Sequence, residues 1–177
     1  MVELIYFFYK YLMKNILLLG SSIIYLFKPK IKNYNIINNG ILGLTVNKML
    51  SKSFLNKYII SNNKYDYMIF YCGNNDLKQD ISRKEIVKNI KIFINTFQEL
   101  YPTTKIIIIS ILLSPKNYEL NLANDIQFIN QHLKKITNIL FINVNRELSH
   151  EKYYIKDNVH LNNIGYDKLN NILEQII

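Results

Sequence analysis

Five strand-length segments of the chain alternate with segments in which apolar residues recur at helical spacing. The strand segments are residues 16–19, 33–38, 67–72, 105–113 and 139–144. Most of them contain an unbroken apolar run, which is typical of a strand buried on both faces of a parallel sheet. Strands that alternate with helices in this way predict an α/β domain with a five-stranded parallel sheet.

The segments between the strands predict helices that pack on this sheet. Helical spacing of apolar residues covers residues 45–54, 82–100, 121–136 and 163–177. Thr45 is the expected N-cap of the first helix, and Pro102 closes the second. The chain has no internal repeat and no linker, and its 177 residues suffice for one domain with a sizeable core.

Composition excludes several kinds of site. Hydrophobic residues make up 49% of the chain and glycine and proline are few, which favours packed structure over disorder. The single cysteine, Cys72, excludes an intramolecular disulfide, and no Cys/His pairing has the spacing of a zinc site. Cys72 lies in a predicted buried strand, so we interpret it as a core thiol. We expect neither a metal nor a cofactor.

The net charge of +9 bears on the partners of the chain. Lys28, Lys30 and Lys32 form the densest basic patch, and the other lysines are spread along predicted helix faces. A positive surface can favour anionic partners. The chain lacks the Arg-rich or aromatic-interleaved pattern of a nucleic-acid groove, so we expect a solvated basic surface and no nucleic-acid partner.

The N-terminal residues 1–12 are apolar and aromatic, but Glu3 and Lys10 interrupt the run. The uninterrupted part is well short of the ~20 residues that span a bilayer. We interpret residues 1–13 as an extension, either an extra helix packed on the domain or a misassigned start upstream of Met13. Residues 14–177 form the domain. The expected location is the cytoplasm; membrane contact through residues 1–12 and secretion are the less favoured alternatives.

Polar motifs follow the predicted strands at their carboxyl ends. Ser22 comes after the first strand, Gly43 after the second and Asn75 after the third, and Asp157 and His160 lie in the loop beyond the fifth. In open parallel sheets the ligand crevice lies outside the carboxyl ends of the strands. We therefore expect these five residues to meet at one edge of the sheet.

The residue types at this edge suit acyl transfer by a serine. Such a reaction needs a nucleophile, a base, a group that orients the base, and donors for the oxyanion. Ser22 is the candidate nucleophile, His160 the base and Asp157 its partner. The backbone N–H groups of Ser22 and Gly43 and the side-chain amide of Asn75 are the candidate oxyanion donors.

Each motif also has a purely structural interpretation. Gly-Ser-Ser and Gly-x-Asn-Asp are ordinary turn sequences, and Asp-x-x-His is more often a helix cap with a surface histidine. Four such motifs in order on one edge favour the chemical interpretation. His132, in a predicted helix, and His150, in a polar loop, are weaker candidates for the base, and Asn124 has a packing or capping role as its alternative.

These motifs resemble the four sequence blocks of the SGNH (GDSL-like) hydrolases, in the same order and over nearly the whole domain. The matching residues are Gly20-Ser21-Ser22-Ile23, Asn38 with Gly43, Gly73-Asn74-Asn75-Asp76 and Asp157-Asn158-Val159-His160. The resemblance implies a flavodoxin-like three-layer α/β/α sandwich and a serine esterase or acylhydrolase. It implies the triad Ser22, Asp157 and His160 and an oxyanion hole of Ser22, Gly43 and Asn75. Ser21 departs from the family's motif, which has Asp there.

Two alternatives to an active esterase predict different sequence features. A nucleotide-binding site needs a glycine-rich loop after the first strand, and Gly20-Ser21-Ser22 is too short for one. A catalytically inactive flavodoxin-like binding module predicts a broken triad, whereas Ser22, Asp157 and His160 are all present. The expected partner is a small carboxylic ester with a short acyl group, such as an O-acetylated sugar or a small lipid, because no insertion is long enough to form a cap.

Overall fold

The computed structural model describes residues 13–60 and 63–177, so the predicted extension lies outside the described residues except for Met13. The described chain forms the expected five-stranded sheet, in which all neighbouring strands are parallel and the order is β2-β1-β3-β4-β5. The strands are β1 (Lys14–Gly20), β2 (Tyr34–Gly40), β3 (Tyr67–Tyr71), β4 (Lys105–Ile109) and β5 (Ile139–Ile142).

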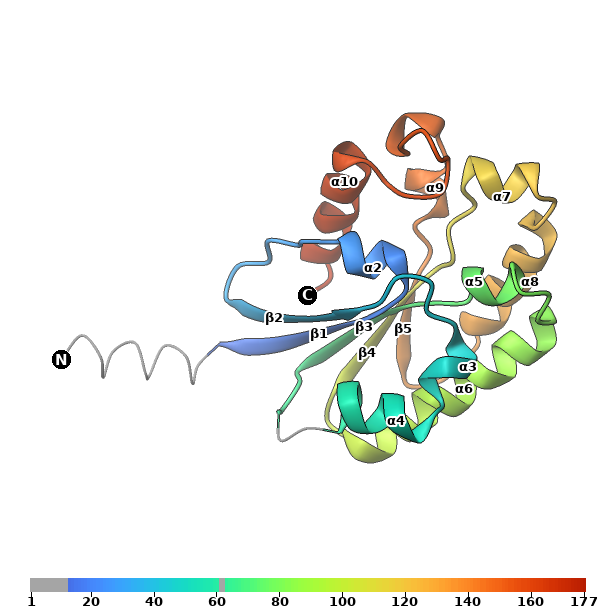
Figure 1. The fold of residues 1–177 in the computed structure, drawn as a ribbon. Coiled ribbons are helices and arrows are strands. Elements are labelled where there is room, and N and C mark those ends of the chain that lie inside the picture. Colours follow the sequence, from blue (N-terminus) through green and yellow to red (C-terminus); the bar gives the residue numbers. More distant parts are fainter. Residues whose placement is uncertain (1–12, 61–62) are drawn as a thin grey trace.

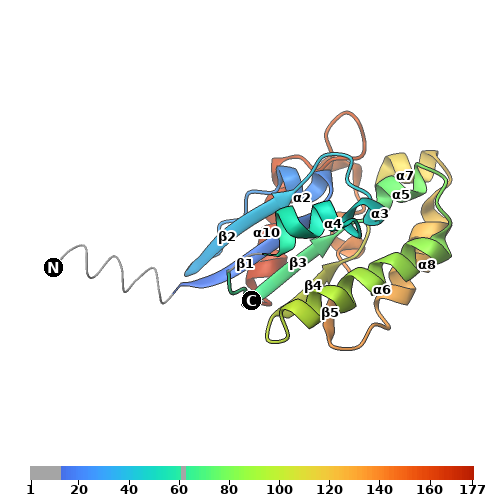
Figure 2. The ribbon, with the colours of Figure 1, turned by 60° about the horizontal axis from the view of Figure 1, so that its bottom comes forward.

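Helices cover both faces of this sheet, giving the predicted three-layer α/β/α fold (Figures 1 and 2). The helices are α2 (Ser22–Leu26), α3 (Val46–Met49), α4 (Lys52–Phe54), α5 (Asn74–Leu77), α6 (Arg83–Leu100), α7 (Pro115–Glu119), α8 (Ala123–Leu133), α9 (Asn145–Leu148) and α10 (Asn163–Glu174). A π-helical turn, Leu55–Ile59, follows α4, and a 3₁₀ turn, Glu151–Tyr153, precedes α10. No helix within the described residues is long and apolar enough to cross a membrane.

Two hydrophobic cores fill the space between the layers. Successive side chains of a strand point to opposite faces, so Leu17 and Leu19 of β1 pack toward α6 and α8, whereas Ile16 and Leu18 pack toward α2 and α10. The central strands β1, β3 and β4 are buried on both faces, which explains their unbroken apolar sequences. The edge strand β2 is only half-buried and accordingly carries asparagines.

Two predicted details of the secondary structure are wrong. Residues 45–54 do not form one helix, because the Ser51 side chain accepts the Phe54 N–H and starts a new one there. The strand predicted over residues 105–113 ends at Ile109, and a short helix that was not predicted, α7, begins at Pro115. Ser114 caps that helix by accepting the Asn117 N–H, and Pro115 occupies the first turn, where its missing N–H costs nothing.

Candidate active site

The sharp turn after β1 places Ser22 at the carboxyl edge of the sheet. A side chain at Gly20 would collide with the Tyr71 carbonyl oxygen of the neighbouring strand, so only glycine fits there. The next N–H, that of Ser21, donates to this same oxygen at 3.0 Å. Helix α2 then begins directly at Ser22. The serine is therefore held by β1, β3 and α2 at once.

A tight loop before α10 places His160. The carboxylate oxygen Oδ1 of Asp157 accepts the N–H groups of Val159 and His160 at 2.8 and 2.9 Å. The other oxygen, Oδ2, lies 2.6 Å from His160 Nδ1. At the base of this loop, the His160 carbonyl accepts the Ile155 N–H at 2.9 Å. Asp157 thus fixes both the backbone and the ring of the histidine.

Ser22 and His160 meet although 138 residues separate them: Ser22 Oγ lies 2.9 Å from His160 Nε2. A carboxylate at Nδ1 favours the tautomer with the proton on that nitrogen, which leaves Nε2 to accept the Ser22 hydroxyl proton. Burial raises the pKa of Asp157, but the hydrogen bonds from His160 and Val159 outweigh it and hold the pKa below its usual range. The carboxylate is therefore ionised at neutral pH.

Gly43 lies in the exposed loop after β2. Its φ of +68° is in the left-handed region, which favours glycine, and a Cβ built there would meet nothing within 4 Å. Asn75 lies at the start of α5, and its Nδ2 donates to the Leu44 carbonyl at 3.0 Å. An amide nitrogen carries two hydrogens, so one remains for another acceptor. The N–H of Ser22, as the first residue of α2, lacks a preceding turn that could accept it.

The remaining histidines and the thiol lie away from this arrangement. The Nδ1 of His132 is 2.8 Å from the Phe128 carbonyl on its own helix, and His150 caps the 3₁₀ turn. Asn124 is exposed on α8. Cys72 is buried, as expected of a core thiol, and burial raises its pKa well above the usual range.

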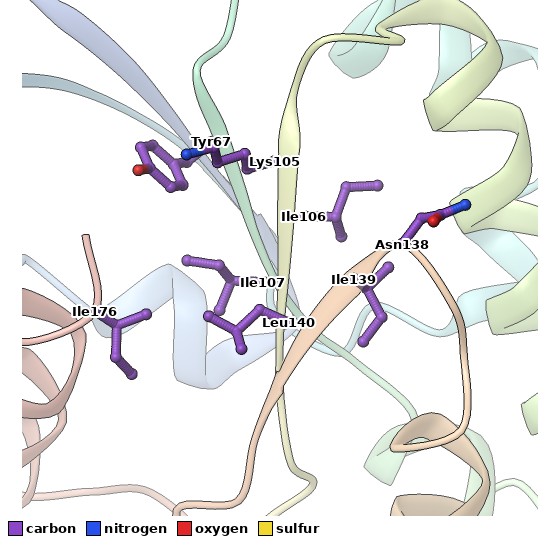
Figure 3. A pocket seen from close by; sticks show the side chains of 8 residues that line it. All are labelled: Tyr67, Lys105, Ile106, Ile107, Asn138, Ile139, Leu140 and Ile176. Carbon is purple, nitrogen blue, oxygen red and sulfur yellow. The ribbon is translucent and has the colours of Figure 1, made fainter.

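A shallow cavity of about 350 Å³ lies at the opposite, amino edge of the sheet (Figure 3). It is lined by the first residues of β3 and β4, Tyr67 and Lys105, and by Leu140 and Ile176. It contains none of the predicted site residues. No group of three potential metal ligands occurs within the described ranges of the chain.

A model of the GDSL-like Lipase/Acylhydrolase family matches residues 25–168. The chain belongs to this family. The matched range includes Gly43, Asn75, Asp157 and His160 but begins just after Ser22, so the position of the serine depends on the geometry described above. A search of the curated proteins finds no match.

Several solved structures have a similar fold. A Streptococcus pneumonia protein, provisionally described as a platelet activating factor, is 25% identical with a TM-score of 0.79, covering 98% of this chain and 91% of its own. A lipase/acylhydrolase from Enterococcus faecalis is 18% identical with a TM-score of 0.75, covering 92% and 94%. A variant of an acetyl-xylooligosaccharide esterase from Geobacillus Stearmophilus is 16% identical with a TM-score of 0.73, covering 92% and 93%.

One further residue beside the site, Asp76, was not predicted to have a role there. Asp76 was noted only as part of the turn after β3, yet its side chain is fully buried and contacts the start of α3. Its sequence signal was weak, because an aspartate after Gly-Asn-Asn is the usual residue of an exposed turn.

Proposed function

We propose that this GDSL-family hydrolase is a serine esterase that cleaves carboxylic esters of short acyl groups through an acyl-enzyme. The single observation that carries the proposal is the continuous contact from Ser22 Oγ to His160 Nε2 and from His160 Nδ1 to Asp157. An inactive binding module has no need for a hydroxyl, an imidazole and a carboxylate aligned within hydrogen-bond distance.

In the first half-reaction, Ser22 Oγ attacks the ester carbonyl carbon while His160 Nε2 takes the hydroxyl proton. Asp157 stabilises the imidazolium that forms and keeps its orientation. The negative charge moves to the carbonyl oxygen, where the N–H groups of Ser22 and Gly43 and the Asn75 amide donate to it. Collapse of this intermediate breaks the bond to the alcohol oxygen, and His160 returns the proton to that oxygen.

In the second half-reaction, water replaces the alcohol. His160 removes a proton from the water as it attacks the acyl carbon, and the same donors stabilise the second oxyanion. The bond to Ser22 Oγ then breaks, the proton returns from His160 to the serine, and a carboxylic acid leaves. No step needs a metal or an organic cofactor.

The proposed substrate class rests on the openness of the site. Helices α2, α3 and α5 begin within a few residues of their strands, so the loops after β1, β2 and β3 are too short to form a cap. Gly43 is exposed, and the adjacent Leu42 is 59% exposed and offers an apolar contact for a small acyl group. The similarity to an acetyl-xylooligosaccharide esterase supports O-acetylated sugars as the first substrates to test, with small lipid esters second.

A panel of chromogenic esters of increasing acyl length, run beside the Ser22→Ala variant, tests this proposal. We expect the highest kcat/KM for acetyl to butyryl esters and no enzymatic hydrolysis by the variant. Equal activity of the variant and the parent chain would contradict the serine mechanism. A preference for long acyl chains would contradict the substrate class alone.

A further inference from the structure

The Asp76 carboxyl is buried in a place where a charge is costly. Its side chain is completely inaccessible, and none of the ion pairs among the described residues includes it. Its partners are backbone N–H groups: both oxygens lie within 3.1 Å of the Val46 N–H, and the Asn47 N–H is a second donor. Burial raises the pKa of Asp76 above its usual value although these donors oppose the shift.

These contacts do more than cap a helix. Thr45 already caps α3 by accepting the Lys48 N–H, and α3 has only four residues. Asp76 instead ties the two N–H groups at the start of α3 to the segment after β3, thirty residues away in sequence. A fully buried carboxyl group that holds backbone N–H groups across thirty residues of sequence indicates a role beyond holding one short helix.

The segment after β3 makes two further contacts with the loop that carries Gly43. The Leu44 carbonyl accepts the Asn75 amide at 3.0 Å and lies 3.4 Å from the Cys72 thiol. Residues 72–76 therefore contact residues 44–47 through three side chains. Gly43 directly precedes these anchors and adopts its left-handed conformation there. On the other side, the Ile41 N–H donates to the Gly20 carbonyl at 2.9 Å.

We infer that Asp76 is a positioning residue that fixes the loop carrying Gly43, so that the Gly43 N–H and the Asn75 amide point at one substrate oxygen. The inference rests on the proposed esterase function. Among the described residues, Asp76 makes no side-chain hydrogen bond or ion pair with Ser22 or His160, and it acts through the backbone of Val46 and Asn47. Its effect is therefore expected in the transition state, where the oxyanion forms, more than in substrate binding.

The first test compares Asp76→Asn with a matched control, Asp66→Asn. Asp66 also accepts a backbone N–H, that of Asn15 at 2.8 Å, but at the amino edge of the sheet. An asparagine at position 76 keeps the size but replaces one of the two acceptor oxygens with an NH₂ donor, so the side chain can no longer accept the Val46 and Asn47 N–H groups through both of its terminal atoms. Since small displacements of catalytic groups cost up to about 10²-fold, we expect Asp76→Asn to lower kcat by roughly 10- to 100-fold with KM unchanged within about twofold.

Asp66→Asn is expected to lower the melting temperature and leave kcat unchanged. If Asp76→Asn also lowers the melting temperature and leaves kcat unchanged, the inference is overturned.

A double-mutant cycle that combines Asp76→Asn with Asn75→Ala tests whether the two residues act on the same oxyanion site. Because both residues serve the same oxyanion site, Asp76→Asn should cost less than about threefold in kcat once Asn75 is gone. Full additivity of the two losses would contradict the inference.

A second pair of variants covers the case in which Asp76→Asn does not fold. Val46→Pro keeps Asp76 but removes its N–H donor, and Thr45, with φ −107° and ψ 155°, already has the conformation required before proline. Val46→Ala is the control, because it loses buried side-chain volume but keeps the N–H. We expect kcat of Val46→Pro to be at least about tenfold below that of Val46→Ala; equal values would overturn the inference.

A measurement without turnover separates this inference from the proposed function. Hydrogen exchange of residues 41–47 reports the order of the loop directly. Asp76→Asn should accelerate exchange there, whereas Asp66→Asn should not. Faster exchange in a chain that hydrolyses no ester would refute the proposed function but keep the role of Asp76 in holding the loop. Unchanged exchange in Asp76→Asn would refute that role.

Discussion

Asn75 donates one side-chain hydrogen to the Leu44 carbonyl at 3.0 Å and has a second hydrogen for a substrate oxygen. This one amide therefore links the loop after β3 to the loop that presents Gly43. We therefore expect a substitution of Asn75 to have two effects, one on the stability of the fold and one on turnover.

Asn75→Ala should lower kcat by on the order of 10²–10³, about 2.7–4 kcal/mol, with little change in KM, because the lost donor acts on the developing oxyanion. Loss of the hydrogen bond to Leu44 should also lower stability by about 0.5–1.5 kcal/mol. Steady-state kinetics and thermal unfolding measure both effects. Asn130→Ala is the matched control, since Asn130 exchanges hydrogen bonds with Ile111 on another loop. Asn130→Ala should lower the melting temperature and leave kcat unchanged. If Asn75→Ala also lowers only the melting temperature, Asn75 is not part of the oxyanion hole.

His160→Ala should lower kcat by about 10⁴-fold, because Ser22 then has no base. Added imidazole can occupy the space left by the ring and should restore part of the activity. His132→Ala and His150→Ala are the controls. Both should retain the parent kcat, because His132 contacts the carbonyl and the ring of Phe128 on its own helix and His150 accepts the Lys152 N–H. A comparable loss in either control would contradict the assignment of the base.

Asp157 predicts a specific dependence of stability on pH. Its pKa is lowered in the folded state, so between the folded pKa and the unfolded value of about 3.9 the unfolded chain binds more protons. The contribution of the Asp157 carboxylate to the free energy of unfolding is therefore fully present above about pH 5 and is lost as pH falls through the folded pKa.

Urea unfolding of the parent chain and of Asp157→Asn across this acid range tests the sign. The variant should show a smaller loss of unfolding free energy on acidification than the parent chain. Asp76→Asn should have the opposite effect and show a larger loss of unfolding free energy on acidification than the parent chain. The pKa of Asp76 is raised in the folded state, so its contribution to the free energy of unfolding falls as pH rises from about 3.9. Parallel curves for Asp157→Asn and the parent chain would contradict the hydrogen bonds assigned to Asp157.

Chelation should leave the esterase activity unchanged, because each proton transfer in the proposed reaction is assigned to His160. The measurement is kcat before and after treatment with a strong chelator. Complete loss of activity, restored by a divalent cation, would contradict the proposed mechanism.

The sheet and the edge at which the polar motifs meet could be predicted because both depend on local sequence. The buried strands are apolar runs, and Ser22, Gly43 and Asn75 each follow directly after a strand. Parallel strands end at the same edge, so contacts between residues as distant as Ser22 and His160 follow from topology. The resemblance to the SGNH family supplied the expected roles of these residues.

Other features depend on contacts that the sequence does not reveal. Ser51 and Ser114 could each be a loop residue or a helix cap, and only the packing of the following turns decides between them. Asp76 has the sequence context of an exposed turn, and its burial results from the approach of Val46, thirty residues away. Such long-range contacts are set by the assembled sheet and leave no local pattern.

The most direct test of the central claim is labelling by an organophosphonate, followed by mass spectrometry of the labelled peptide. The proposed mechanism predicts one label per chain, attached to Ser22, with loss of activity in proportion to labelling. Ser22→Ala should take up no label while keeping the melting temperature of the parent chain. Undiminished labelling of Ser22→Ala, or labelling of the parent chain at another residue with equal loss of activity, would contradict it.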